Sequence, residues 1–197
     1  MPLGANKAAI MGVAGVSTGS VVLLSSQTAT SSTSIDFTSG IDATYGEYIF
    51  RFYNMNPEYE NTASFVFNGS IDGGSNYNVT KTTTFFRALH YEDNSAADLA
   101  YSTSGDIAQG TGNQYLAREV EHLADGSCVG ELHLFNPAST TYVKQFYATI
   151  NSNNSANSSR NSFVAGYFND ADDNIDAMTF KFSTGSFSGT IKLWGVL

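Results

Sequence analysis

The sequence has one cysteine, few charged residues and no apolar run long enough to cross a membrane. Cys128 alone cannot form an intrachain disulfide, and it excludes a zinc site built from several cysteines. A buried, inert thiol is the expected state of this residue. The fold must therefore be stabilised by its own hydrophobic core or by neighbouring subunits.

Positive charge is especially scarce. Charged residues make up 14% of the chain, against about 25% in an average globular protein. Nine Lys and Arg stand against eighteen Asp and Glu, which gives a net charge of -9. Because such a chain repels phosphate backbones, we expect no nucleic-acid partner.

The motifs of common enzymes are absent as well. The sequence has no Gly-x-Ser-x-Gly elbow, no phosphate-binding loop and no dinucleotide fingerprint. His90, His122 and His133 are not spaced as metal ligands. We therefore predict no catalytic residue, no cofactor and no enzymatic activity, although a triad assembled from distant residues would leave no such motif. Because it alternates with Leu132 and Leu134, His133 is expected to face solvent or a neighbouring subunit.

Two pairs of acids and one acidic segment have alternative interpretations. Glu92 with Asp93, and Glu119 with Glu121, would suit glycoside hydrolysis if their carboxylates lay about 5 to 10 Å apart. In a chain this acidic, solvation of the surface is the favoured interpretation.

The acidic segment has the spacing of the start of a calcium-binding loop. Its alternate positions are taken by Asp170, Asp172, Asn174 and Asp176. However, Ile175 stands in place of the turning glycine, and Lys181 in place of the bidentate glutamate. We favour an acidic solvated turn over a bound Ca²⁺, and no metal site is predicted.

What the sequence does contain is alternation of apolar and polar residues. It is clear in residues 178–182 and in residues 189–197, where Ile191, Leu193 and Leu197 share one face. A period of two is typical of half-buried strands, which must pack into a sandwich or barrel. We predict an all-β chain that folds as a jelly-roll-like antiparallel β-sandwich with an extended N-terminal arm.

Nine or ten strands follow from the pattern. They are expected at residues 21–24, 45–55, 65–67, 77–89, 115–120, 130–135, 142–150, 163–168, 177–182 and 190–196. Residues 115–120 are also compatible with a helix, and residues 25–34 with a linker or an edge strand. The strand at 45–55 should be covered on both faces, since both carry aromatic side chains. A bulge is expected near residues 82–84, and an exposed loop at residues 151–161.

The strand pattern divides the chain into two parts. Residues 1–30 are expected to form an N-terminal arm and linker for assembly contacts, and residues 31–197 are expected to form the β-sandwich domain. Residues 8–16 are apolar but fall short of the roughly 20 residues that cross a bilayer, so we expect no membrane partner. The arm is expected to pack on the parent domain or on another subunit. Trp194 is out of phase with Ile191 and should cover a second layer or lie at a subunit contact, of which we favour the contact. The predicted assembly contacts are Ile10, Met11, Val13, Val16 and Trp194.

Several short runs together cover most of the chain from about residue 35 onwards. They are EYIFRF (47–52), DGGSNY (72–77), TTTFFR (82–87), GELHLFNP (130–137), SFVAGYF (162–168) and SGTIKLWGV (188–196), with ANKAAIMG (5–12) before them. In these runs the chain resembles virion structural proteins of marine tailed bacteriophages.

The resemblance implies a jelly-roll-like particle component in the virion, without enzymatic activity and without active-site residues to transfer. We expect a homo-oligomeric capsid decoration, head-fibre or tail-associated protein, with threefold assembly as the first expectation. Its partners would be further copies of itself and other virion proteins such as the capsid or tail. The alternatives are a carbohydrate- or receptor-binding module, in which Trp194 and loop tyrosines stack on sugar, and a glycan-cleaving enzyme.

Overall fold

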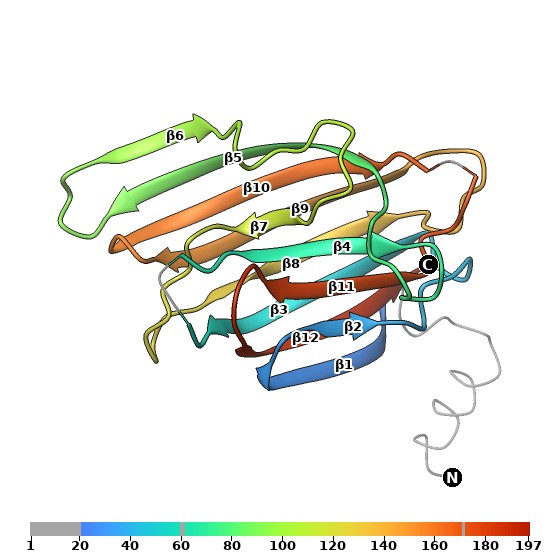
Figure 1. The fold of residues 1–197 in the computed structure, drawn as a ribbon, viewed down its shortest axis with the longest axis horizontal. Coiled ribbons are helices and arrows are strands. Elements are labelled where there is room, and N and C mark those ends of the chain that lie inside the picture. Colours follow the sequence, from blue (N-terminus) through green and yellow to red (C-terminus); the bar gives the residue numbers. More distant parts are fainter. Residues whose placement is uncertain (1–20, 60–61, 171) are drawn as a thin grey trace, which may run out of the picture.

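The computed structural model describes residues 21–59, 62–170 and 172–197, and these residues form two antiparallel sheets without a helix (Figure 1). The predicted all-β class is therefore confirmed. In chain order the strands are β1 (Val21–Ser32), β2 (Ile35–Phe37), β3 (Glu47–Pro57), β4 (Phe65–Ser70), β5 (Lys81–Tyr91), β6 (Ala97–Tyr101), β7 (Gln114–Ala117), β8 (Cys128–Phe135), β9 (Lys144–Asn154), β10 (Ser158–Phe168), β11 (Ala177–Phe182) and β12 (Phe187–Val196).

The strand order is that of a jelly roll with an extension. Strands β1-β12-β3-β8 form one half of the larger sheet, and β2-β11-β4-β7 form the smaller sheet in front of it (Figure 1). Along the chain β1, β2, β3 and β4 alternate between the sheets, as do β7 with β8 and β11 with β12, which is the winding of two Greek keys. The remaining strands extend the larger sheet in the order β9-β10-β5-β6.

Aromatic side chains fill the space between the sheets. Phe180 on β11 has its ring centroid 5.0 Å from that of Phe50 and 5.2 Å from that of Phe52, both on β3. Phe52 in turn meets Phe65 of β4 edge to face at 5.1 Å. Alternation delivers these rings to the core because every second residue of a strand faces the opposing sheet.

The smaller sheet covers only one face of the larger one, and two predictions were wrong for this reason. Residues 21–24 do not form a buried strand: they begin the edge strand β1, where Val21 and Leu23 are exposed. The strand at 45–55 is central, but Arg51 and Tyr53 on its outer face are exposed. Of the residues predicted to be linker or edge strand, 25–32 belong to β1.

The expected loop at residues 151–161 is also absent, because β9 and β10 continue through it as one long hairpin. Its inward polar side chains are buried rather than solvated. The amide of Asn154 donates to the carbonyl oxygens of Arg118 at 3.2 Å and Glu119 at 2.7 Å. Tertiary hydrogen bonds of this kind let Asn and Ser form a strand in spite of their turn propensity.

Four smaller differences separate the structure from the prediction. The prediction of a bulge near residues 82–84 is wrong, since β5 pairs with β10 without a break in register. Phe85 faces the core and Phe86 faces out, so the alternation continues through this segment. Residues 115–120 are strand only to Ala117. Leu197 follows β12 and is exposed, so it does not share the buried face of Ile191. The alternation missed the short strands β2 and β6.

Candidate interaction surface

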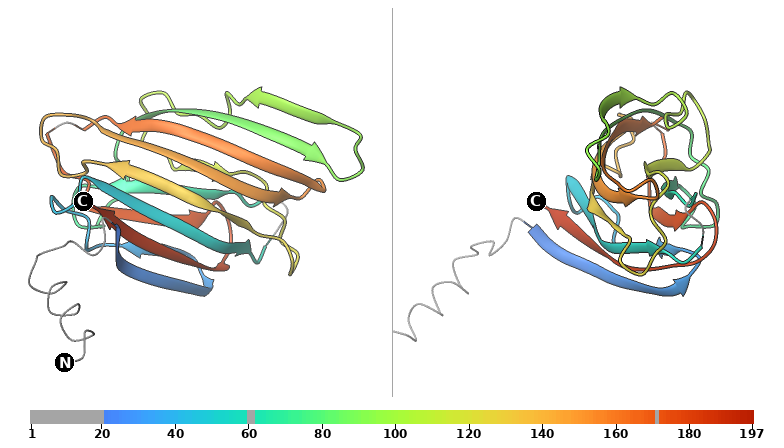
Figure 2. Two further views of the ribbon diagram at one scale, coloured as in Figure 1. Left: turned by 180° about the vertical axis from the view of Figure 1, so that it is seen from behind. Right: turned by 90° about the vertical axis from the view of Figure 1, so that its left-hand side faces the viewer.

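The outer face of the larger sheet, called the outer face below, is covered by no other element in the described part of the chain (Figure 2). It carries many large apolar and aromatic side chains, although an outward sheet face is usually polar. The exposed ones are Leu23, Tyr53, Phe86, Leu99, Tyr101, Val129 and Tyr147, and the half-buried ones include Phe135, Phe163, Tyr167 and Trp194. A contiguous surface of this kind typically marks an interaction site.

Aromatic stacking gives the outer face a fixed shape. Phe86 of β5 and Phe163 of β10 lie opposite each other in register and stack with 4.8 Å between ring centroids and 11° between planes. Tyr101 of β6 is the register neighbour of Phe86. One row of rings therefore crosses the extension from β10 to the sheet edge.

Trp194 lies on the outer face, opposite Ile49 and beside Leu23 in register. Its indole is therefore on the opposite side of β12 from the buried Ile191, as its phase predicts. The guanidinium carbon of Arg51 lies 5.8 Å from the ring centroid, a cation–π distance. The indole Nε1 is buried without a hydrogen-bond partner among the described residues.

A row of charges runs beside the rings. Arg51 pairs in register with Lys192 of β12 on one side and with Glu131 of β8 on the other. Its Nε lies 3.2 Å from Glu131 Oε2. Burial acts to raise the pKa of Glu131, but the charges and hydrogen bonds of His133 and Arg51 outweigh it, so that pKa lies below its ordinary value.

His133 lies on the outer face, but only 8% of it is exposed, so of the two expected surroundings, solvent and a neighbouring subunit, solvent is excluded. Its Nδ1 is 2.5 Å from Glu47 Oε1 and its Nε2 is 3.1 Å from Glu131 Oε1. Both ring nitrogens therefore contact a carboxylate. Tyr147 covers the ring, and alternation alone shows neither this cover nor the two acids.

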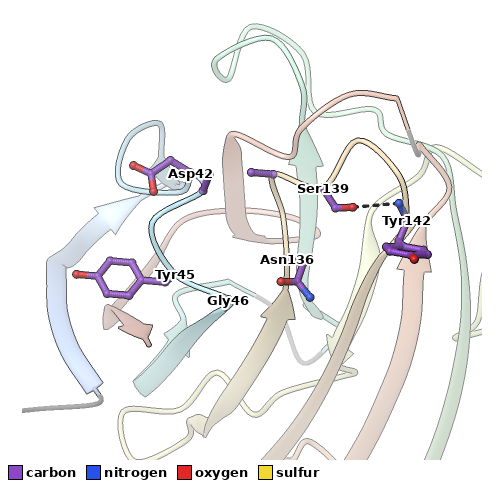
Figure 3. A pocket seen from close by; sticks show the side chains of 8 residues that line it. Asp42, Tyr45, Gly46, Asn136, Ser139 and Tyr142 are labelled. Atoms are coloured by element: carbon purple, nitrogen blue, oxygen red, sulfur yellow. Dashed lines mark hydrogen bonds between the residues drawn. The ribbon is translucent and has the colours of Figure 1, made fainter.

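A second candidate lies at one end of the sandwich, in the loops before β3 and after β8 (Figure 3). This hollow of about 400 Å³, called the loop pocket below, has Tyr45 on one side and Tyr142 on the other. Tyr45 packs edge to face on Tyr48 at 5.8 Å. Tyr142 is exposed, and its backbone N–H donates to Ser139 Oγ at 3.0 Å.

Asp42 at the rim of the loop pocket is already engaged. Its carboxylate accepts the Thr44 backbone N–H at 2.8 Å and the Tyr48 hydroxyl at 2.9 Å. The backbone hydrogen bond from Thr44 is the leading reason why the pKa of Asp42 is lowered. Of the polar and aromatic lining groups, Tyr142 is therefore the one most open to a ligand.

The acidic residues and histidines considered in the sequence analysis make separate contacts and do not form one site. The carboxylate of Asp176 accepts the Gly73 backbone N–H at 3.0 and 3.1 Å, whereas Asp170 Oδ1 accepts that of Asp173. Asp172 and Asn174 are exposed. Within the described ranges, no three His, Cys, Asp or Glu side chains are grouped as metal ligands.

Glu119 and Glu121, one of the two acid pairs considered for glycoside hydrolysis, have different partners. Glu119 contacts Arg160, while Glu121 is buried and accepts the backbone N–H of His122 at 3.0 Å. Glu92 and Asp93 lie at the turn between β5 and β6. His90 contacts Asn94 at 3.1 Å.

The arm residues Ile10, Met11, Val13 and Val16 lie outside the described residues. Among the residues that are described, no helix has the length and apolarity to span a membrane. No protein-family model, curated protein or solved structure matches this chain.

Proposed function

We propose that this chain is a non-enzymatic structural protein of a virus particle: a homo-oligomeric capsid decoration, head-fibre or tail-associated component located in the virion. The outer face carries the proposal, because a jelly-roll domain that leaves so many rings uncovered has surface to bury against another molecule. The sequence resemblance to virion structural proteins points in the same direction.

A second copy of the chain is the partner that the outer face fits best. Its charges are ordered across three strands, from the cations Lys192 on β12 and Arg51 on β3 to the carboxylate of Glu131 on β8. A rotated copy can therefore set its cations against carboxylates while the rings are buried between them. This arrangement suits a symmetric contact better than it suits a strongly charged partner.

Light scattering coupled to size-exclusion chromatography tests this proposal. Tyr147→Glu puts a charge in the middle of the outer face and should reduce the mass of the assembly to that of one chain. Tyr142→Glu makes the same change at an exposed tyrosine of the loop pocket and should keep the wild-type mass. Phe86→Glu repeats the test at a second position. Wild-type mass in both outer-face variants, or a monomeric wild type, would contradict the proposal.

The arm is proposed to attach the assembly to the particle through Ile10, Met11, Val13 and Val16. Because β1 begins at Val21, a chain that lacks residues 1–18 keeps every described strand. This chain should fold and should no longer join particles when it competes with the full chain. Normal incorporation of the truncated chain would show that the arm is not the attachment.

A carbohydrate- or receptor-binding function is the second candidate, and the loop pocket favours it. The exposed ring of Tyr142 lines the same pocket as the amide of Asn136 (Figure 3), and a ring in a pocket with such a polar group can stack on a sugar while the amide bonds its hydroxyls. Glycan-array binding that is lost in Tyr142→Ala would support this function. Binding that is lost in Trp194→Ala would assign it to the outer face, and an array without any bound glycan would exclude it.

A further inference from the structure

Three of the four arginines of this chain line one pocket. Arg87 comes from β5, Arg160 from β10, and Arg118 from the residue after β7. The pocket has a volume of about 240 Å³ and lies where the loop after β6 passes the extension of the larger sheet. In a protein with a net charge of -9, such a concentration of guanidinium groups requires a reason.

The local partners of these arginines neutralise them only in part. Arg118 Nη1 donates to the uncharged hydroxyls of Ser104 at 2.7 Å and Ser102 at 3.3 Å, and its Nη2 lies 4.0 Å from Glu119 Oε1. Arg160 Nη1 lies 3.2 Å from Glu119 Oε2, the one carboxylate among the described lining residues.

The third arginine has its partner outside the pocket. Arg87 Nη2 is 3.4 Å from Asp98 Oδ2 on β6, and Asp98 does not line the pocket. Three cations therefore share a single lining acid.

Buried hydrogen-bonding groups without partners lie at the pocket and on the strands beside it. Arg160 is 8% exposed, and its Nε has no hydrogen-bond partner among the described residues. The hydroxyls of Ser152, Ser158 and Ser162 are unpartnered too; they do not line the pocket, but Ser152 is opposite Arg160 in register and the other two flank it on the same side of β10. Buried polar atoms are nearly always bonded, so Arg160 Nε is a spare donor of a residue that lines the pocket.

The like charges act on one another. Burial is the leading cause of the lowered pKa of Arg160; Glu119 opposes it, while Arg87 and Arg118 lower it further. An anion in the pocket would relieve this repulsion.

We propose that the pocket binds a small oxyanion of the carboxylate or phosphate class. Guanidinium forks match the paired oxygens of both groups and bind them with charge-assisted hydrogen bonds. The hydroxyls of Ser102 and Ser104 add two neutral donors at the rim. The volume exceeds the roughly 30 Å³ share of one water molecule several-fold and is too small for a polymer. The proposal is independent of the assembly through the outer face.

Isothermal titration calorimetry of the full chain tests the proposed anion binding. Sodium phosphate and sodium acetate are titrated separately, with sodium chloride of equal ionic strength as the reference. We expect saturable binding of at least one of the two anions. The anion that binds more tightly shows whether the pocket prefers phosphates or carboxylates. Arg118→Gln and Arg87→Gln should each weaken this binding by about tenfold or more, as expected for the loss of one charged hydrogen bond. Both side chains are partly exposed, at 28% and 26%, which favours folded variants.

Lys181→Gln is the matched control, since it removes one positive charge from β11, away from the pocket. It should bind the anion as the wild type does. Absence of saturable binding in the wild type would overturn the proposal. An equal loss in Lys181→Gln would also overturn it, by showing general charge attraction.

Discussion

The imidazole of His133 stacks on the phenol ring of Tyr147, with 4.5 Å between ring centroids and 13° between planes. The two side chains come from neighbouring strands, β8 and β9, and are register partners on the outer face. Burial is the leading reason for the raised pKa of Tyr147, and the charges of Glu47 and Glu131 add to it. Stack and ion pairs together hold this part of the outer face in one arrangement.

Replacing His133 by Gln should destabilise the fold. Gln lacks the two ring nitrogens that contact Glu47 and Glu131. We expect a loss of about 1–3 kcal/mol in the free energy of unfolding, measured by urea titration. His90→Gln, at an exposed position, should change it by less than about 0.5 kcal/mol. Equal stability of the two variants would show that the ion pairs contribute nothing.

Gly130 and Gly73 form a matched pair for a test of close packing in the sheet. Both have positive φ, at 155° and 70°, but a Cβ at Gly130 would lie 2.2 Å from the Thr149 carbonyl oxygen, whereas one at Gly73 would meet nothing within 4 Å. Gly130→Ala should therefore cost about 1–3 kcal/mol more than Gly73→Ala in urea unfolding. Similar costs would mean that β8 and β9 separate easily at this point.

Asp72 should contribute to stability at neutral pH and lose this contribution in acid. Hydrogen bonds from Asn76 and Ser70 lower its pKa from 3.8 to about 2. Because the folded-state pKa is the lower one, the contribution is complete above about pH 4 and disappears as the pH falls toward about 2. Asp72→Asn should unfold at lower urea than the wild type at pH 7, and the difference should shrink between pH 4 and pH 2. A difference that stays constant over this range would contradict the assignment.

Cys128 should not react in the folded protein. It is 1% exposed, and burial raises the pKa of its thiol far above the ordinary value. Since the thiolate is the nucleophile, a disulfide reagent such as Ellman's should label the native chain no faster than the chain unfolds. Rapid labelling without denaturant would show that β8 opens at its first residue.

The sequence predicts the core better than it predicts the surface. The strand predicted at 177–182 matches β11 to the residue, because its apolar residues face the core at every second position. The hairpin at 151–161 fails this test: Asn154 and Arg160 are buried, and their polar partners Arg118 and Glu119 come from the segment after β7. Its burial is a property of the assembled fold.

The pocket with three arginines was missed for the same reason. Arg87, Arg118 and Arg160 are 31 and 42 residues apart in sequence, from 87 to 118 and from 118 to 160, and no local motif joins them. They meet only because β5 pairs with β10 and the segment after β7 passes beside both strands. The same applies to His133, whose phase on β8 was predicted but whose acidic neighbour Glu47 comes from β3.

An electron cryo-microscopy map of the purified assembly tests the central claim most directly. The proposed function predicts density of a second copy against the outer face, covering Tyr147, Phe163 and Trp194. An assembly in which these three side chains stay open to solvent, with copies in contact elsewhere, would contradict it.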